Sequence, residues 1–225
     1  MKTIGVLTIG QAPRADDTVA ELRRTLGPGY AIAERGALDG LSRAAIVELA
    51  PAPGEYLLIT LLADGTSVTL GKPKILSLLQ RQIDTFGADG VDAILLLCTG
   101  TFPEMKAQRL VIQPQPVLYR MMIGLAGPSG RIGALTPLAG QLGQARAKWR
   151  EFGVDPILGV ASPYDGAGEV AGAAREVAEQ GADVIFMDCM GYSLEMKARA
   201  RAAAGGRPVV LARSAIARVL AEIVE

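Results

Sequence analysis

The two cysteines of the chain lie in the same sequence pattern, which occurs twice. Cys98 opens the segment Cys-Thr-Gly-Thr-Phe-Pro-Glu-Met-Lys, and Cys189 opens Cys-Met-Gly-Tyr-Ser-Leu-Glu-Met-Lys. Each cysteine follows an apolar run, which predicts a strand that delivers a thiol to the mouth of an α/β sheet. A thiolate and a thiol can act as a base and an acid on one substrate. We therefore interpret Cys98 and Cys189 as a candidate pair of catalytic residues.

Two other interpretations of the cysteines stay open. Free cysteine is among the most buried residue types and often packs as a small apolar side chain. A disulfide is the other alternative, although nothing else in the sequence indicates an oxidising compartment. The repetition of the whole pattern, with glycine two residues after each thiol, favours the chemical interpretation.

The composition excludes several kinds of chemistry. The chain contains no histidine, which rules out Ser-His-Asp and Cys-His nucleophile systems and His-rich zinc sites, and we expect neither a metal nor a cofactor. Lys plus Arg and Asp plus Glu both total 23, so bulk charge gives no argument for nucleic acid or an anionic membrane as a partner. No apolar run approaches the roughly 18 residues that span a bilayer. We interpret the protein as cytoplasmic.

Strands and helices are predicted to alternate along the chain. Strands are expected at residues 3–8, 30–34, 56–62, 91–97, 131–136 and 155–161. Helices are expected at about 13–26, 42–49, 73–86, 140–152, 166–180, 193–204 and from 214 to the end, with another helix opened by the capping-box pattern Thr101-x-x-Glu104. This alternation predicts parallel sheets built from right-handed crossovers.

The second part of the sequence repeats the first. Residues 131–136 echo 3–8, residues 155–161 echo 57–62, and residues 208–210 echo 116–118. We therefore expect an N-terminal α/β half at 1–115 and a C-terminal half at 116–212, with the segment 113–116 as a hinge. The last helix, at 213–225, either completes the first half or packs on the second.

Ligands of parallel sheets bind beyond the carboxyl ends of the strands, where helix N-termini present their N–H groups. Besides the cysteines, the residues expected at these ends are Thr8, Gly10, Gln11, Asp64, Thr99, Thr136, Asp165 and Gly191. Arg14 suits bidentate binding of a carboxylate, with a solvent-facing helix arginine as the alternative.

Several other polar residues have a structural interpretation. For Asp64 and Asp165, turn chemistry or helix capping is favoured over contact with a substrate amine. Asp188 is expected to point away from the thiol and to make a structural hydrogen bond. Glu104 and Glu195 suit first helical turns, Trp149 suits core or interface packing, and Tyr192 either touches a ligand or caps its loop.

The chain resembles the AroM family over nearly its full length. The resemblance lies in the paired Cys-x-Gly strand ends, the opening Ile-Gly-Val-Leu-Thr-Ile-Gly-Gln, the Leu61-Leu-x-Asp64-Gly turn and the segment from Ala182 to Gly191. AroM proteins in turn resemble the aspartate/glutamate racemase superfamily. That resemblance implies two pseudo-symmetric flavodoxin-like (Rossmann-like) halves that face a central cleft. It also implies cofactor-independent chemistry by two cysteines at the alpha carbon of a substrate.

The resemblance also implies roles for individual residues. Cys98 and Cys189 match the two acid-base positions of the superfamily. Its carboxylate-binding turns match Thr99, Gly100 and Thr101 on one side and Met190 and Gly191 on the other. Common racemases have Asn-Thr after the first cysteine and Gly-Cys-Thr around the second, whereas this chain has Thr99-Gly100 and Asp188-Cys189-Met190. The substrate therefore cannot be transferred from the relatives.

These observations support one leading hypothesis and two alternatives. The leading hypothesis is a racemase or epimerase that acts on a small carboxylate-bearing metabolite, and it allows a homodimer. One alternative is a single-thiol decarboxylase or cis-trans isomerase of the same superfamily. The other is a non-catalytic protein that binds a small carboxylate and regulates another process.

Overall fold

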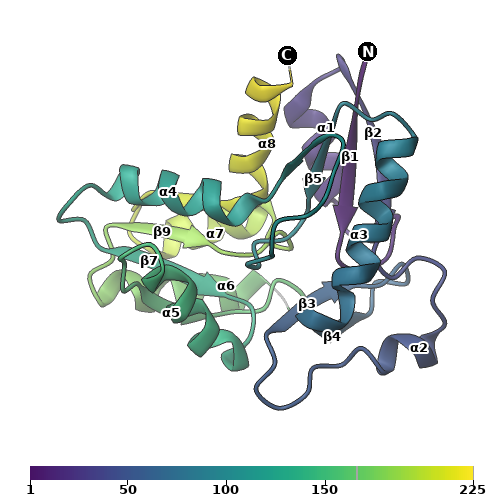
Figure 1. Cartoon of the computed structure of the whole chain (residues 1–225). Coiled ribbons are helices and arrows are strands. Elements are labelled where there is room, and N and C mark those ends of the chain that lie inside the picture. The colour runs from purple at the N-terminus through teal and green to yellow at the C-terminus, as the bar shows by residue number, and fades with distance from the viewer. Residues whose placement is uncertain (166, 225) are drawn as a thin grey trace. The chain divides into compact units, whose positions relative to one another are not determined.

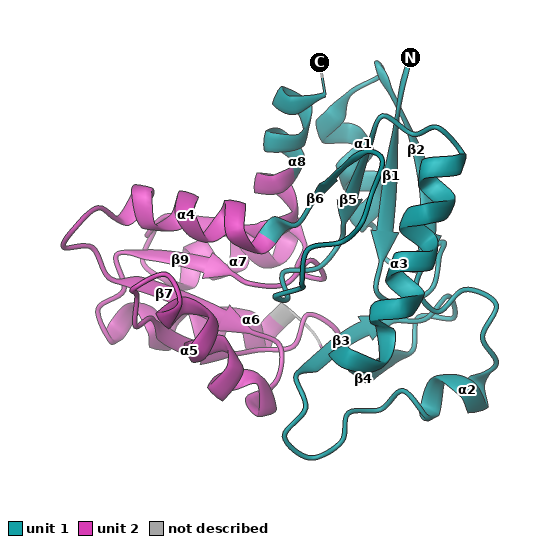
Figure 2. Cartoon of the chain, viewed as in Figure 1, with its two compact units in different colours: residues 1–114, 217–225 teal, residues 115–216 magenta. Residues whose placement is uncertain are grey.

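The chain folds into two compact units. A computed structural model describes residues 1–165 and 167–224 of the chain. Contacts within the chain group Met1–Pro114 with a C-terminal segment that begins at Ala217, and they group Gln115–Ile216 as a second unit (Figure 2). None of the helices in the described ranges is both long enough and apolar enough to cross a membrane.

The first unit is built on a four-stranded parallel sheet with strand order β2-β1-β5-β6 (Figure 1; β6 is labelled in Figure 2). Its strands are β1 (Lys2–Thr8), β2 (Tyr30–Gly36), β5 (Ala93–Leu96) and β6 (Leu110–Ile112). The helices of this unit include α1 (Thr18–Leu26), α2 (Arg43–Val47) and α3 (Lys72–Ala88). The central strands β1 and β5 are buried for most or all of their length, because a parallel sheet is covered on both faces.

The second unit repeats this plan with strand order β8-β7-β9-β10. Its strands are β7 (Ile132–Thr136), β8 (Ile157–Val160), β9 (Val184–Met187) and β10 (Val209–Leu211). Its helices are α4 (Pro114–Ala126), α5 (Leu142–Arg150) after the 3₁₀ turn η1 (Ala139–Gln141), α6 (Ala167–Glu179), α7 (Leu194–Ala203) and the start of α8 (Ala212–Ile223). The predicted fold class, two parallel α/β halves, is confirmed.

The two sheets correspond residue by residue. Leu7 of β1 pairs with Leu96 of β5, and Leu135 of β7 pairs with Met187 of β9. The next ladder bond is also shared, because the amide of residue 97 donates to Leu7 and the amide of residue 188 donates to Leu135. The predicted echo between residues 3–8 and 131–136 is therefore a structural equivalence, and both cysteines follow equivalent strands.

The other two predicted echoes are wrong. Residues 57–61 form β3 (Leu57–Leu61), which pairs antiparallel with β4 (Ser67–Gly71) in a separate hairpin, so the counterpart of β8 is β2. Residues 116–118 lie inside α4, and the counterpart of β10 is β6. The sequence analysis missed β4, β6 and α4. A short strand that pairs only with its neighbour in a hairpin leaves a weak pattern in the sequence.

Two predicted helices also differ from the structure. The helix expected from residue 13 begins at Thr18, because Arg14 and Asp16 lie in a loop in which they bind each other and the Arg14 N–H binds Glu34. No helix follows Thr101, so Glu104 has no helix dipole to complement, whereas Glu195 does lie in the first turn of α7. The predicted start of the helix at residue 166 lies outside the described residues.

Glycine is required at the centre of both equivalent first strands. A Cβ at Gly5 would come within 2.9 Å of the Phe86 ring on α3, and a Cβ at Gly133 would overlap the Val177 side chain on α6. Each glycine therefore lets a crossover helix approach its sheet closely.

We expect Gly133→Ala to lower the free energy of unfolding by about 1–3 kcal/mol, because the added methyl overpacks this contact. Gly143→Ala is the matched control, since Gly143 lies on α5 with no atom within 4 Å of an added Cβ. That change should raise stability by about 0.5–1 kcal/mol through helix propensity. Urea unfolding of both variants measures the difference, and equal effects would contradict the proposed close approach.

Candidate active site

Cys98 lies two residues beyond the last paired residue of β5, in an irregular turn. Its side chain is half-buried and packs beside the apolar core of the first unit. The backbone N–H of Gly100 points at its sulfur, with 3.3 Å between Gly100 N and Cys98 Sγ. A donor aimed at the sulfur stabilises the thiolate relative to the thiol. No helix starts directly after this turn, so the N–H that faces the thiol comes from the turn itself.

The turn after Cys98 is tightly packed at its glycine. A Cβ at Gly100 would come within 3.1 Å of both Leu58 and Phe102 and within 3.4 Å of the Cys98 sulfur. Thr99 is 6% exposed. Thr101 is partly exposed, and its backbone N–H donates to the hydroxyl of Tyr56. The three residues predicted to form a carboxylate-binding turn therefore lie together around the thiol.

The loop after β1 packs against the β3–β4 hairpin of the same unit. The side-chain oxygen of Thr8 accepts the N–H of Gly10 at 3.3 Å. Gln11 donates its backbone N–H to Leu61 and accepts the N–H of Ala63 with its side-chain oxygen. Gly10 is required here because a Cβ would overlap the carbonyl of Leu61. Thr8, Gly10 and Gln11 thus make a rigid connection at the carboxyl end of β1.

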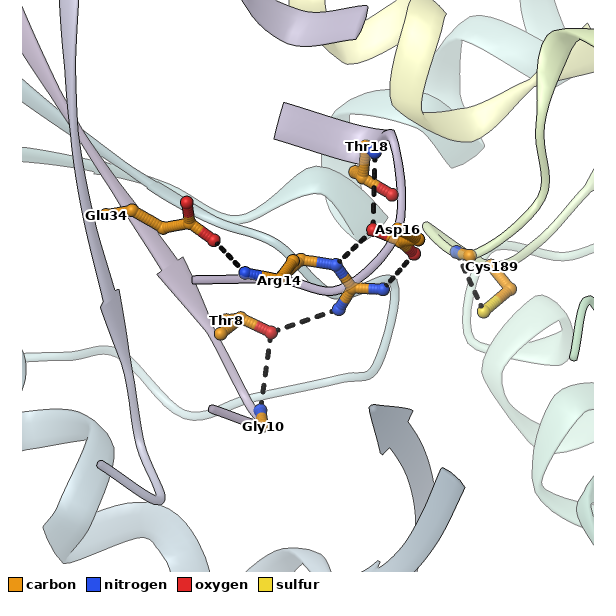
Figure 3. Close-up of polar contacts among 8 residues, drawn as sticks. Thr8, Gly10, Arg14, Asp16, Thr18, Glu34 and Cys189 are labelled. Carbon is orange, nitrogen blue, oxygen red and sulfur yellow. Dashed lines mark hydrogen bonds and ion pairs between the residues drawn. The ribbon is translucent and has the colours of Figure 1, made fainter. Parts of the chain in front are cut away.

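Arg14 is neither in a helix nor directed to solvent. Its side chain is 3% exposed and makes two hydrogen bonds to the carboxylate of Asp16, at 2.9 and 2.5 Å, and one to the hydroxyl of Thr8 at 3.1 Å (Figure 3). Its backbone N–H donates to Glu34. The fork of a guanidinium suits a carboxylate, and here a carboxylate of the chain itself occupies it.

The neighbouring Arg14 lowers the pKa of the Asp16 carboxylate. Burial raises its pKa, but hydrogen bonds from Arg14 and Thr18 and the positive charge of Arg14 outweigh burial, so the pKa lies below the ordinary value of 3.8. A carboxylate with a lowered folded-state pKa contributes stability that is complete above its unfolded pKa. That contribution is lost as the pH falls through the folded pKa.

We expect Asp16→Asn to destabilise the protein most at neutral pH, with the difference from wild type shrinking as the pH drops below about 3.8. Urea unfolding at a series of pH values measures this. Asp89→Asn is the control, because Asp89 pairs with Arg35 at an exposed position where an ion pair contributes little. A constant difference for Asp16→Asn across this range would contradict the assignment.

The side chain of Asp64 stabilises the turn in which it lies. Its side chain is exposed, accepts the N–H of Thr66 at 2.9 Å and pairs with exposed Arg43. The hydrogen bond from Thr66 is the largest cause of a lowered pKa at this residue. The turn interpretation of the sequence analysis accounts for these contacts. Asp165 is also exposed, and its neighbour Gly166 lies outside the described residues.

Cys189 repeats the geometry of Cys98 in the second unit. It is half-buried, it lies two residues beyond the last paired residue of β9, and its sulfur lies 3.4 Å from the backbone N of Gly191. Met190 is buried at 3% exposure. Gly191 fits against Pro163 and Tyr164, since a Cβ there would come within 2.9 Å of Pro163. The two thiols therefore lie at equivalent strand ends, and each receives the N–H of the glycine two residues later.

Tyr192 lies in the core of the second unit. It is 0% exposed, and its hydroxyl donates to the carbonyl of Ala161 at 2.6 Å. Burial, followed by the charges of Cys189, Asp188 and Tyr164, raises the pKa of this phenol well above 10. Of the two predicted roles, capping of the loop describes these contacts. Contact of Tyr192 with a ligand stays a prediction.

Asp188 is held in a buried ionic cluster. Its carboxylate accepts the hydroxyl proton of Tyr119 at 2.5 Å and pairs with Lys148 at 3.1 Å. Burial and the charge of Asp188 raise the pKa of Tyr119 well above 10. Tyr119 also stacks on fully buried Trp149, with ring centroids 3.8 Å apart. The structural hydrogen bond predicted for Asp188 and the core packing predicted for Trp149 are confirmed.

Removing one member of this cluster should be costly. Lys148→Met leaves the buried carboxylate of Asp188 without its cation, so we expect a loss of about 3–5 kcal/mol. The double variant Lys148→Met/Asp188→Asn should recover part of this loss, because the remaining group is neutral. Urea unfolding of the two single variants and the double variant measures the coupling, and additive losses would contradict a charge-paired cluster.

Thr136 ends β7, as Thr8 ends β1. It is 5% exposed, and its hydroxyl donates to the side chain of Gln141 at 3.4 Å.

Among the described residues, no group of three or more His, Cys, Asp or Glu side chains is placed to hold a metal ion.

Sequence reasoning missed three residues that support these turns. Tyr56 and Lys72 contact Thr101, and Lys148 pairs with Asp188. Tyr56 and Lys72 flank a hairpin whose second strand was not predicted. Lys148 gives no local signal beyond lying on the same predicted helix as Trp149.

Solved structures of three enzymes share the fold of the chain. The maleate cis-trans isomerase of Nocardia farcinica matches with a TM-score of 0.66 and 15% sequence identity, over 99% of this chain and 92% of that chain. The allantoin racemase of Pseudomonas fluorescens matches with a TM-score of 0.62 and 15% identity, over 98% of this chain and 89% of that chain. An unliganded arylmalonate decarboxylase matches with a TM-score of 0.60 and 15% identity, over 100% of this chain and 93% of that chain. At this identity the likeness defines the fold, which is that of racemase-like α/β proteins.

The chain belongs to the AroM protein family, whose pattern matches residues 4–224. No curated protein sequence matches the chain. The resemblance stated from the paired cysteine patterns is therefore confirmed at the level of the family and the fold.

Proposed function

We propose that the protein is a cofactor-independent racemase or epimerase that acts at the alpha carbon of a small carboxylic acid. One thiolate, at Cys98 or Cys189, removes the alpha proton, and the thiol of the other cysteine delivers a proton to the opposite face. The electron pair of the broken C–H bond passes into the carboxylate and returns when the new C–H bond forms. The two cysteines exchange protonation states in each turnover.

One observation carries this proposal. The two half-buried thiols occupy equivalent positions, each two residues past the last pair of the equivalent strands β5 and β9, and each receives a backbone N–H from the glycine two residues later. An internal duplication that keeps a thiol at one strand end in both copies supports a reaction that uses a base and an acid of the same type.

The turns beside the thiols supply groups for the substrate carboxylate. Thr99, Gly100 and Thr101 in one unit and Met190 and Gly191 in the other lie at the strand ends. The N–H groups of Gly100 and Gly191 bind the cysteine sulfurs and that of Thr101 binds Tyr56, so a substrate carboxylate would share or replace these contacts. Negative charge develops on the carboxylate as the proton leaves, and preorganised N–H donors stabilise that charge more than the ground state. Thr8, Gln11, Thr136 and Arg14 would add to this set, Arg14 only if the substrate replaced Asp16 on its guanidinium.

A single-thiol reaction is the second candidate. A maleate cis-trans isomerase and an arylmalonate decarboxylase share the fold with similar scores to the racemase. Isomerisation by addition of one thiolate to a double bond, or decarboxylation followed by protonation from one thiol, would use the same strand ends. These reactions depend on one cysteine, whereas racemisation depends on both.

Isotope exchange separates the candidates. A panel of small carboxylic acids is incubated in deuterated water with wild type, Cys98→Ser and Cys189→Ser. We expect deuterium at the alpha position with wild type, and a loss of about 10²–10⁴-fold in the rate of racemisation for each variant. Circular dichroism and urea unfolding of each variant establish that the fold is retained.

The pattern of loss decides between the reactions. Dependence on both cysteines supports two-base racemisation, and dependence on one supports the single-thiol reactions. Ligand stabilisation that survives Cys98→Ala/Cys189→Ala, with no exchange by wild type over a broad panel of acids, would favour a binding or regulatory protein.

A further inference from the structure

The β3–β4 hairpin holds the turn after Cys98 through residues at its base. Tyr56 precedes β3, and Lys72 follows β4 as the first residue of α3. The backbone N–H of Lys72 donates to the carbonyl of Tyr56 at 2.9 Å, so the hairpin closes at this pair. The hairpin has no counterpart among the strands described for the second unit, whose β8 is equivalent to β2.

Both backbone groups of Thr101 are bound by this pair of side chains. The N–H of Thr101 donates to the hydroxyl of Tyr56 at 3.2 Å, and the ammonium of Lys72 donates to the carbonyl of Thr101 at 3.1 Å. Two hydrogen bonds on one residue fix the orientation of both of its peptide planes. The side chains of Tyr56 and Lys72 therefore fix the main-chain conformation at Thr101.

Tyr56 and Lys72 also fix each other. The Lys72 ammonium lies 4.2 Å from the centroid of the Tyr56 ring, which is within the range of a cation–π interaction. The ring limits where the ammonium can lie, and the ammonium keeps the ring in place. The two contacts to Thr101 are thus parts of one cluster.

Apolar packing around Gly100 links the position of Thr101 to the Cys98 thiol. Leu58 of β3 and Phe102 both lie close enough to Gly100 that a Cβ there would contact each at 3.1 Å, and the same Cβ would lie 3.4 Å from the Cys98 sulfur. The N–H of Gly100 in turn donates to that sulfur. A shift of Thr101 therefore moves the donor that faces the thiol.

The second unit supports its turn differently. Ser193 accepts the N–H of Met196 and starts α7 directly after the turn, and the buried hydroxyl of Tyr192 binds Ala161. After Cys98 the chain stays irregular through residue 107, although the capping-box pattern predicted a helix there. The hairpin cluster supplies the support that a helix supplies in the second unit.

We propose that Tyr56 and Lys72 are positioning residues that fix the main chain of residues 98–101 and thereby the orientation of the Cys98 thiol. The proposal deepens the proposed function, on which its role in catalysis rests. Neither side chain needs to touch the substrate. A displacement of about 1 Å at a reacting group can lower a rate by about 10²-fold, so loss of either contact should reduce turnover more than binding.

The first test needs no substrate. Amide hydrogen exchange across residues 98–102 is measured in wild type, Tyr56→Phe and Lys72→Met. Tyr30→Phe and Lys74→Met are the matched controls, because Tyr30 binds Ala221 and Lys74 binds the carbonyls of Glu48 and Ala50. We expect exchange in this segment to rise about 3–10-fold in the two cluster variants, the range for loss of one hydrogen bond, and to stay unchanged in the controls.

The second test uses catalysis. With a substrate found by isotope exchange, Tyr56→Phe and Lys72→Met should lower kcat about 10-fold or more while KM changes less than about threefold. Lys72→Arg should restore much of kcat, because a guanidinium can donate to Thr101 and stack on Tyr56.

Each outcome has one meaning. Equal exchange of residues 98–102 in cluster variants and controls would overturn the inference. So would an active enzyme whose kcat is insensitive to both cluster substitutions. An inactive wild type would overturn the proposed function alone, and hydrogen exchange would still decide whether Tyr56 and Lys72 hold the turn.

Discussion

A single backbone hydrogen bond closes each parallel ladder just before its thiol. The amide of Leu97 donates to Leu7 in one unit, and the amide of Asp188 donates to Leu135 in the other. The paired strands are buried, so a slip of one residue would turn apolar side chains away from their partners, and the register is fixed. Because the register is fixed, each cysteine follows the last pair of its ladder by two residues. Its sulfur then faces the N–H of the glycine two residues later. All the chemistry inferred for the protein depends on this placement.

The two units share the ladder but not the support behind it. In the first unit, polar contacts from Tyr56 and Lys72 reach the main chain of Thr101. In the second, Asp188 is anchored by Lys148 and Tyr119 directly before the thiol, whereas the first unit has apolar Leu97 at that position. Duplication thus conserved the positions of the sulfur atoms while their surroundings diverged.

Strands β1, β5, β7 and β9 were predictable because buried parallel strands are continuous apolar runs. The repeated Cys-x-Gly pattern also marked the ends of β5 and β9. Local patterns failed where tertiary contacts took over. Pro13 suggested a helix start, but Arg14 and Asp16 bind each other and the helix begins at Thr18. Thr101 suggested a helix cap, but both of its backbone groups bind hairpin side chains instead. The partners of Thr101 lie 45 and 29 residues away, and the backbone N–H of Arg14 binds Glu34, 20 residues away. No local window contains these contacts.

The last residues of the chain complete the unit that its first residues begin. The segment from Ala217 groups with Met1–Pro114, and the carbonyl of Ala221 accepts a hydrogen bond from Tyr30. During synthesis on a ribosome the N-terminal unit would therefore emerge long before its final helical turns exist. The contacts between this unit and its final turns can form only after the whole of the other unit has been translated. The order in which the polypeptide is made is thus not the order in which its units can be finished.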